Sequence, residues 1–200
     1  MAETSLRERK AKQTRARIAE AALDLFAKQG YAETTADQIA QAADVSRRTL
    51  FLHFPNKAAM LFDHFAGQRE AALQRLRARP TSEGMLASLH AVLRELCEEG
   101  YDRQLLRQIR TVLDTEPEIA ASQLSLASQT FQRAVVATLE ERSGRQKSSL
   151  EVKALTIMAL GWMTTASHIY LVEGRSSLVK CFDEVVATCR HATTRDLGQI

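Results

Sequence analysis

Two short helices joined by a tight turn are predicted between Gly30 and Pro55, and this pair constrains the fold more than any other feature of the chain. Residues 35–38 read Thr-Ala-Asp-Gln, a capping box that opens a short helix. Asp44 follows in the turn, where Asp tolerates a left-handed backbone, and Ser46 caps the next helix. Two short helices in this arrangement form a helix-turn-helix.

The rest of the chain predicts further helices. Glycines and prolines number only 8 and 3 in 200 residues, and they fall at intervals of one helix length. Apolar residues between them recur at helical spacing. We therefore predict an all-α protein with an N-terminal three-helix head at 1–57 and a helical body at 58–200. Besides the two short helices, the expected helices are 7–29, 57–79, 82–99, 102–114, 118–142, 149–173 and 176–197.

Basic residues gather in the N-terminal quarter. Residues 1–57 hold 10 Lys and Arg against 7 Asp and Glu, whereas residues 58–200 hold 17 of each. Arg47, Arg48 and Lys57 each fall in the first turn of an expected helix, where a cation is unfavourable, and this indicates an external anion such as a nucleic-acid phosphate. Six earlier cations could form an arm along DNA or remain solvated: Arg7, Arg9, Lys10, Lys12, Arg15 and Arg17.

The N-terminal segment resembles the TetR family of transcriptional regulators. The resemblance runs over about 45 residues with several fixed spacings, and the matching stretches are Thr14–Phe26, Gly30-Tyr31, Thr35–Ala40, Val45-Ser46, Thr49–Phe54 and Asn56-Lys57. It implies a DNA-binding helix-turn-helix head at about 35–54 and an all-helical body that dimerises and binds a ligand. Beyond residue 65 the resemblance is one of architecture only.

The resemblance also implies which side chains meet DNA, namely Thr35, Ser46, Arg47, Arg48, Thr49, Phe51, His53 and Lys57. Two positions depart from the family pattern, because Asp44 replaces a usual glycine and Phe51 a usual tyrosine. Phenylalanine cannot donate a hydrogen bond to a phosphate, so that contact is absent or apolar. Phe51 could equally pack inside the head, and without the resemblance His53 could equally be structural.

The helix expected at 149–173 is apolar nearly all round, which predicts burial on more than one side. A chain of this size buries one face easily, so the second face favours a homodimer built from this helix and the one at 176–197. The resemblance implies dimerisation on the same helices. A membrane span is disfavoured because the uncharged run 154–172 contains Thr164, Ser167 and His168.

Soft and aromatic side chains in the body exceed what a helix seam requires, which favours an apolar or amphipathic small-molecule effector. For each residue alone, ordinary core packing is the simpler interpretation. The candidate ligand-binding residues are Leu89, His90, Ile109, Arg110, Phe131, Met158, Trp162, Met163 and His168.

Catalysis is not expected, because the five histidines are scattered and no nucleophile, phosphate-loop or dinucleotide motif is present. The three cysteines lack the spacing of a metal site, so we expect no metal and no cofactor. The sequence predicts a cytoplasmic regulator that binds a double-stranded DNA operator. We expect it to act as a repressor that its effector releases from the operator. The alternative is an architectural DNA-binding protein without an effector.

Overall fold

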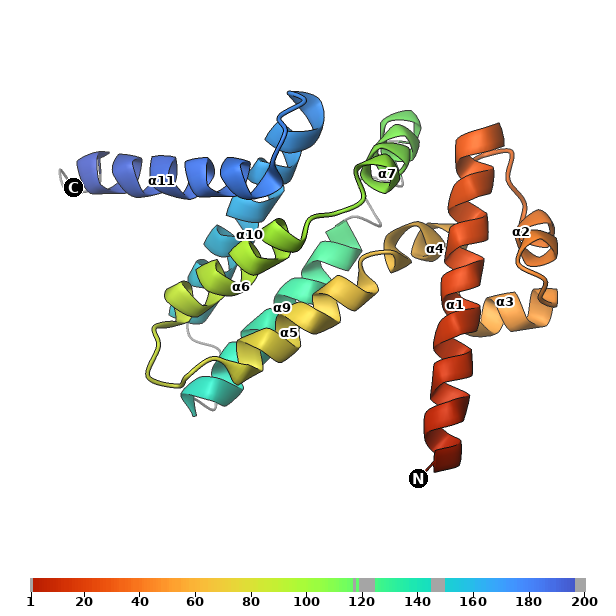
Figure 1. Ribbon diagram of the computed structural model, residues 1–200, viewed down its shortest axis with the longest axis horizontal. Helices are drawn as coiled ribbons and strands as arrows, with labels where there is room; N and C mark the ends of the chain where they lie inside the picture. Colours follow the sequence, from red (N-terminus) through yellow and green to blue (C-terminus); the bar gives the residue numbers. More distant parts are fainter. Residues whose placement is uncertain (1, 117, 119–124, 145–149, 197–200) are drawn as a thin grey trace. The chain divides into compact units, whose positions relative to one another are not determined.

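The computed structural model describes residues 2–116, 118, 125–144 and 150–196, and every regular element within them is an α-helix (Figure 1). The chain forms two compact units, residues 1–67 with 104–128 and residues 68–103 with 129–200. The helices are α1 (Ala2–Gln29), α2 (Ala36–Ala42), α3 (Arg47–His53), α4 (Lys57–Asp63), α5 (Ala66–Ala78), α6 (Met85–Glu99), α7 (Arg103–Thr115), α9 (Ser125–Ser143), α10 (Leu150–Val172) and α11 (Leu178–Asp196). The all-α prediction is confirmed.

The predicted helix-turn-helix is present, with its predicted caps. The Thr35 hydroxyl accepts a hydrogen bond from the backbone N–H of Gln38, and the Gln38 side chain accepts one from the N–H of Thr35. Asp44 has a φ of +50°, the left-handed conformation expected in the turn. The Ser46 hydroxyl then caps α3 by accepting from the N–H of Thr49 at 3.0 Å.

The core of the first unit joins α1 to the helices that follow it. Ile18, Ala22 and Phe26 form one buried stripe of α1 and share a core with Ile39 of α2, Leu50 of α3 and Leu61 of α4. Ile109 and Val112 of α7 are buried in the same core. The unit is therefore larger than the head expected at 1–57, and the functional boundary after residue 57 stays a prediction.

The single helix expected at 57–79 is wrong, because the structure ends α4 at Asp63 and begins α5 at Ala66. The two residues between the helices, His64 and Phe65, are neither glycine nor proline, and the nearest glycine, Gly67, lies inside α5. Instead, Asp63 accepts a hydrogen bond from Arg15 Nε at 2.8 Å, and His64 Nε2 lies 3.2 Å from the carbonyl oxygen of Ala19. These contacts hold the end of α4 against α1, which is a tertiary effect that local sequence signals do not contain.

The second unit packs α5, α6, α9, α10 and α11 around one core. One face of α10 is buried there, including Val152, Ala159 and Trp162. The other face is exposed and still apolar, since Ile157 is 57% and Val172 55% exposed. Within one chain, α10 is therefore buried on one side only. By length and composition α10 could also cross a membrane, a test that core helices of soluble proteins pass as well.

Candidate DNA-binding helix and ligand groove

The first candidate site is the exposed side of α3. Its first turn presents Ser46 and Thr49, whose hydroxyl oxygens lie 2.8 Å apart, and the exposed cations Arg47 and Arg48. Thr35, at the start of α2, is also exposed. The structure thus places the hydroxyls of Ser46 and Thr49 beside Arg47 and Arg48 at the start of α3, and their contact with DNA, which the resemblance implied, stays a prediction.

The two arginines differ in their surroundings. Arg47 Nη1 lies 2.9 Å from Asp37 Oδ2, and its guanidinium carbon lies 5.7 Å from the centre of the Phe51 ring. Both side chains of the ion pair are nearly two-thirds exposed, so the pair contributes at most about 1 kcal/mol and is cheaply exchanged for a phosphate. Arg48 makes no ion pair with the described residues. Arg48 is thus the freer of the two cations.

Two large apolar side chains lie exposed at the other end of α3. Phe51 is 45% exposed and Leu52 is 82% exposed, although water disfavours both. The sequence analysis did not single out Leu52, but its place four residues after Arg48 puts both on neighbouring turns of the helix. His53 is half-buried, and its carbonyl oxygen accepts a hydrogen bond from Arg15.

Lys57 has a structural role in this conformation. Its ammonium donates to the carbonyl oxygens of Tyr31 and Thr34, both at 2.8 Å, and lies 4.4 Å from the centre of the Tyr31 ring. Burial lowers the pKa of Lys57, while the carboxylates of Glu116 and Glu33 act in the opposite direction. The Lys57 side chain thus ties α4 to the loop between α1 and α2, and its predicted contact with a phosphate stays a prediction.

The second candidate site is a groove in the second unit, with a volume of 720 Å³, within the usual range of ligand pockets. We call it the α6–α10–α11 groove. Three of the predicted ligand residues, His90, Met158 and Trp162, line it. Its other lining residues are Glu83, Leu86, Ala87, Ala91, Val186, Cys189, Arg190, Thr193 and Thr194.

The remaining predicted ligand residues lie elsewhere. Ile109 and Arg110 are on α7, where Ile109 is buried in the core of the first unit and Arg110 pairs with Asp114 at 2.8 Å. In the second unit, Leu89 is buried in the core, Phe131 and Met163 pack against that core, and His168 is exposed. None of these six residues lines the groove.

An aromatic cluster underlies the groove. The rings of His90 and Trp162 have centres 6.4 Å apart in an edge-to-face arrangement, and each lies within 6.5 Å of the Phe182 ring. Trp162 is only 8% exposed, and its indole Nε1–H has no hydrogen-bond partner among the described residues. Buried polar groups without a partner are rare in folded proteins.

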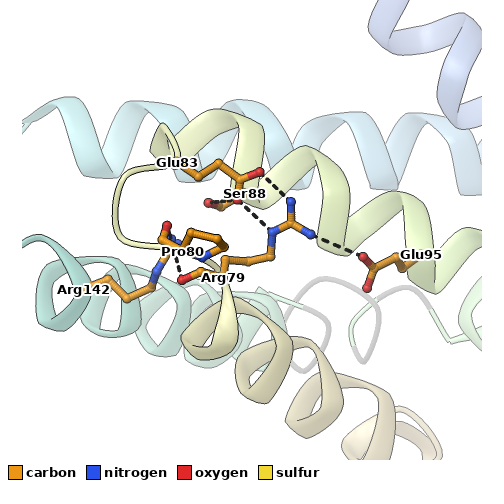
Figure 2. A network of polar contacts seen from close by, with 6 residues as sticks. All are labelled: Arg79, Pro80, Glu83, Ser88, Glu95 and Arg142. Carbon is orange, nitrogen blue, oxygen red and sulfur yellow. Dashed lines mark hydrogen bonds and ion pairs between the residues drawn. The ribbon is translucent and has the colours of Figure 1, made fainter.

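A polar network surrounds Glu83, one of the residues that line the groove (Figure 2). The Glu83 carboxylate accepts hydrogen bonds from Arg79 and from the Ser88 hydroxyl, and Arg79 also lies 3.6 Å from Glu95. The hydrogen bond from Arg79, then that from Ser88, lowers the pKa of Glu83 to about 2. Arg142 donates to the carbonyl oxygen of Pro80 at 2.8 Å. The charge of Glu83 is therefore already compensated inside the protein.

Within the described residues, no group of three or more His, Cys, Asp or Glu side chains could hold a metal ion. Cys97, Cys181 and Cys189 are free thiols, and burial raises the pKa of Cys97 to about 12. A thiol with so high a pKa carries little of the reactive thiolate at neutral pH.

Comparison with known proteins matches both parts of the chain. Residues 18–63 match the family model of bacterial regulatory proteins of the tetR family, and residues 83–193 match the model of the MftR C-terminal domain. The HTH-type transcriptional regulator TcmR of Streptomyces glaucescens is 33% identical over 126 residues, which are 60% of this chain and 56% of TcmR. The chain thus matches little more than half of that relative's length. The putative mycofactocin biosynthesis transcriptional regulator MftR of Mycobacterium tuberculosis is 25% identical over 82% of each chain.

Solved structures show the same fold. FadR of Thermus thermophilus, a TetR-family transcriptional repressor solved in complex with lauroyl-CoA, has 26% identity and a TM-score of 0.53, over 86% of this chain and 91% of its own. NalD of Pseudomonas aeruginosa, a repressor of a multidrug efflux pump, has 20% identity and a TM-score of 0.58, over 89% of this chain and 95% of its own. Both likenesses cover nearly all of the chain.

Proposed function

This chain belongs to the TetR family of bacterial regulatory proteins, and we propose that it is a cytoplasmic repressor that binds a DNA operator as a homodimer and leaves it when a small ligand binds the body. The observation that carries the proposal is the exposed side of α3, where guanidinium, hydroxyl and apolar groups lie together on one short, capped helix. The relatives are named as transcriptional regulators, and the proposal includes no catalytic activity.

In the proposed complex, α3 enters the major groove of DNA. Arg47 and Arg48 read base edges, for which guanine is the best bidentate partner of arginine. The hydroxyls of Thr35, Ser46 and Thr49 sit at helix N-termini, where phosphates are favoured. The other proposed contacts are Phe51, His53 and Lys57.

The proposed homodimer buries the exposed apolar side of α10. Ile157 and Val172 are 57% and 55% exposed, on a helix whose apolar composition is more typical of a core helix. Such a patch on a soluble protein marks an interaction surface. A two-fold dimer presents two copies of α3 to successive major grooves, roughly 34–36 Å apart.

Effector release is proposed to start from the body. A ligand need only bind more tightly to the dimer when the spacing of its two heads does not match the operator. A difference of about 1.4 kcal/mol in ligand binding free energy between the two head spacings weakens DNA binding tenfold. The complex of FadR with lauroyl-CoA shows that a protein of this fold binds an amphipathic ligand. For this chain, the α6–α10–α11 groove supports the proposal through His90, Met158 and Trp162.

The proposal is tested by fluorescence anisotropy of a labelled operator obtained by selection from random duplexes. We expect saturable binding that lipophilic small molecules reverse. If every compound that binds the body leaves the affinity for the operator unchanged, effector release is contradicted. The body would then serve only for dimerisation. Binding without sequence preference contradicts the repressor and favours the architectural protein.

A further inference from the structure

The short helix α3 has little packing of its own to fix its direction. It is 7 residues long, and a helix of this length is unstable without tertiary contacts. Leu50 is the buried residue of α3, and Phe54, which follows the helix, is also fully buried. The last carbonyl groups of a helix have no partner within it, so the C-terminal end of α3 needs a donor from elsewhere.

Arg15 of α1 supplies this donor. Its Nη1 donates to the carbonyl oxygen of His53, the last residue of α3, and its Nε donates to Asp63 Oδ1 at the end of α4, at 2.8 Å. The guanidinium carbon lies 4.2 Å from the centre of the Phe54 ring. One side chain therefore joins α1, α3 and α4. A guanidinium suits this role because its N–H groups point in fixed and different directions.

The burial of Asp63 makes this contact costly to lose. The side chain of Asp63 is only 11% exposed, that of Arg15 is 41% exposed, and Asp63 forms no other ion pair with the described residues. Removing the partner of a buried charge leaves that charge uncompensated. The pair differs in this respect from Arg47 and Asp37, whose side chains are both nearly two-thirds exposed.

The other cations in the first half of α1 lack such contacts. They are exposed and form no ion pair with the described residues, and they are Arg7, Arg9, Lys10, Lys12 and Arg17. The sequence left two roles open for all six cations, contact with DNA or solvation. For Arg15 the structure adds a third role, inside the head itself.

We propose that Arg15 is a positioning residue for operator binding, which holds α3 in the direction in which its side chains meet the bases. Its charge is compensated by Asp63 and not by a phosphate of DNA. This inference rests on the proposed function, because it takes α3 as the helix that reads the operator.

Anisotropy titrations of the selected operator with Arg15→Gln and Arg15→Lys test the proposal. We expect each variant to bind about tenfold more weakly, as it would if α3 were correctly placed in about one molecule in ten. Arg15→Lys keeps the charge but loses the fork of the guanidinium, so it is not expected to restore the affinity. Full affinity of Arg15→Lys would indicate a contact with phosphate and overturns the proposal.

Asp63→Asn gives the sharpest contrast, because it weakens the contact while it removes a negative charge from the head. Charge alone predicts that this variant binds DNA more tightly. The proposal predicts binding about threefold weaker, because Arg15 loses the carboxylate that orients it. Asn has the size of Asp, so this variant decides the question even if Arg15→Gln does not fold. Tighter or unchanged binding overturns the proposal.

The salt dependence of binding distinguishes positioning from a phosphate contact. Loss of one phosphate contact flattens the slope of log affinity against log salt by about 0.9. Arg15→Gln is expected to keep the slope of the wild type and to lose the same factor at every salt concentration. Arg17→Gln removes an exposed cation of the same helix and is the matched control for the charge. Equal losses of affinity in Arg15→Gln and Arg17→Gln overturn the assignment.

Hydrogen exchange of the free protein separates this inference from the proposed function. In Arg15→Gln we expect the amides of residues 47–54 to exchange faster than in the wild type, and those of α10 to remain unchanged. A wild type without a preferred duplex contradicts the repressor, while the exchange of residues 47–54 still decides whether Arg15 holds α3. Unchanged exchange there overturns the proposal. Faster exchange with full operator affinity also overturns it, because Arg15 would then have a structural role only.

Discussion

The exposed side of α3 and the α6–α10–α11 groove differ in how their hydrogen-bonding groups are satisfied. On α3 the paired groups are in contact with water, Ser46 with Thr49 and Arg47 with Asp37, and Arg48 makes no ion pair with the described residues. Beneath the groove the indole N–H of Trp162 is buried and has no hydrogen-bond partner among the described residues. An exposed pair exchanges partners at little cost, whereas a buried, unpaired donor gains the full value of a new acceptor. The first arrangement suits a charged, hydrated partner such as DNA, whereas the second leaves a donor unsatisfied inside the core beneath the groove.

The largest expected effect distinguishes the two regions by stability. Phe182→Ala removes a fully buried ring beneath the groove and is expected to lower the free energy of unfolding by about 3–5 kcal/mol. Leu52→Ala removes an exposed side chain of α3 and is expected to change it by about 0.5 kcal/mol at most. Urea unfolding followed by circular dichroism measures both. Similar losses for the two variants would show that α3 is not the exposed surface described.

The next effect concerns base reading by α3. Arg48→Ala is expected to cost about 1–3 kcal/mol at the preferred operator and little at an unrelated duplex. Arg47→Ala is expected to cost somewhat less, because Arg47 must first leave Asp37. Anisotropy titrations on both duplexes measure the difference, and Asp37→Asn, which releases Arg47, is the control. If neither arginine matters, α3 does not read the operator.

A smaller effect tests the exposed apolar residues of α3. We expect Phe51 and Leu52 to contact thymine methyl groups, the apolar feature of the major groove. Replacing the contacted thymine by uracil removes one methyl group and is expected to cost about 0.8 kcal/mol. Leu52→Ala should abolish this cost at the base it contacts. A uracil scan of the operator with no sensitive position would leave these side chains without a role in DNA recognition.

The smallest effect is a pH dependence of the body. The pKa of Glu83 falls from 4.5 to about 2 on folding. The stability that the ionised carboxylate gives the fold is therefore complete above pH 4.5 and is lost as the pH falls towards 2. Glu83→Gln removes this dependence. Acid unfolding of the wild type should therefore be steeper between pH 4.5 and 2 than that of the variant. Parallel curves would mean that the network of Figure 2 does not form in solution.

The sequence-based predictions are accurate where the contacts join residues close together in sequence, and they fail where the contacts join residues far apart in sequence. Thr35 and Gln38 are three residues apart, as are Ser46 and Thr49, so the caps of α2 and α3 could be predicted from local sequence. The break between α4 and α5 could not, because it depends on His64 reaching Ala19, which lies 45 residues earlier.

The groove shows the same limit more strongly. Its lining comes from residues 83 to 194, and which side of α11 faces α6 is decided by packing rather than by periodicity. Apolar character on α10 pointed to Met158 and Trp162, whereas nothing local distinguished Arg190 from other surface arginines. Ile109 has the same apolar character but lies in the core of the first unit, which residues of α1 to α4 also form.

Selection of bound duplexes from a random pool by the full chain tests the central claim most directly. We expect one enriched sequence with two-fold symmetry, whose half-sites lie about one helical turn apart, as a dimer with one α3 in each major groove requires. Enrichment that Arg48→Ala abolishes would assign the reading to α3. A pool that emerges without any preferred sequence would contradict a sequence-specific repressor.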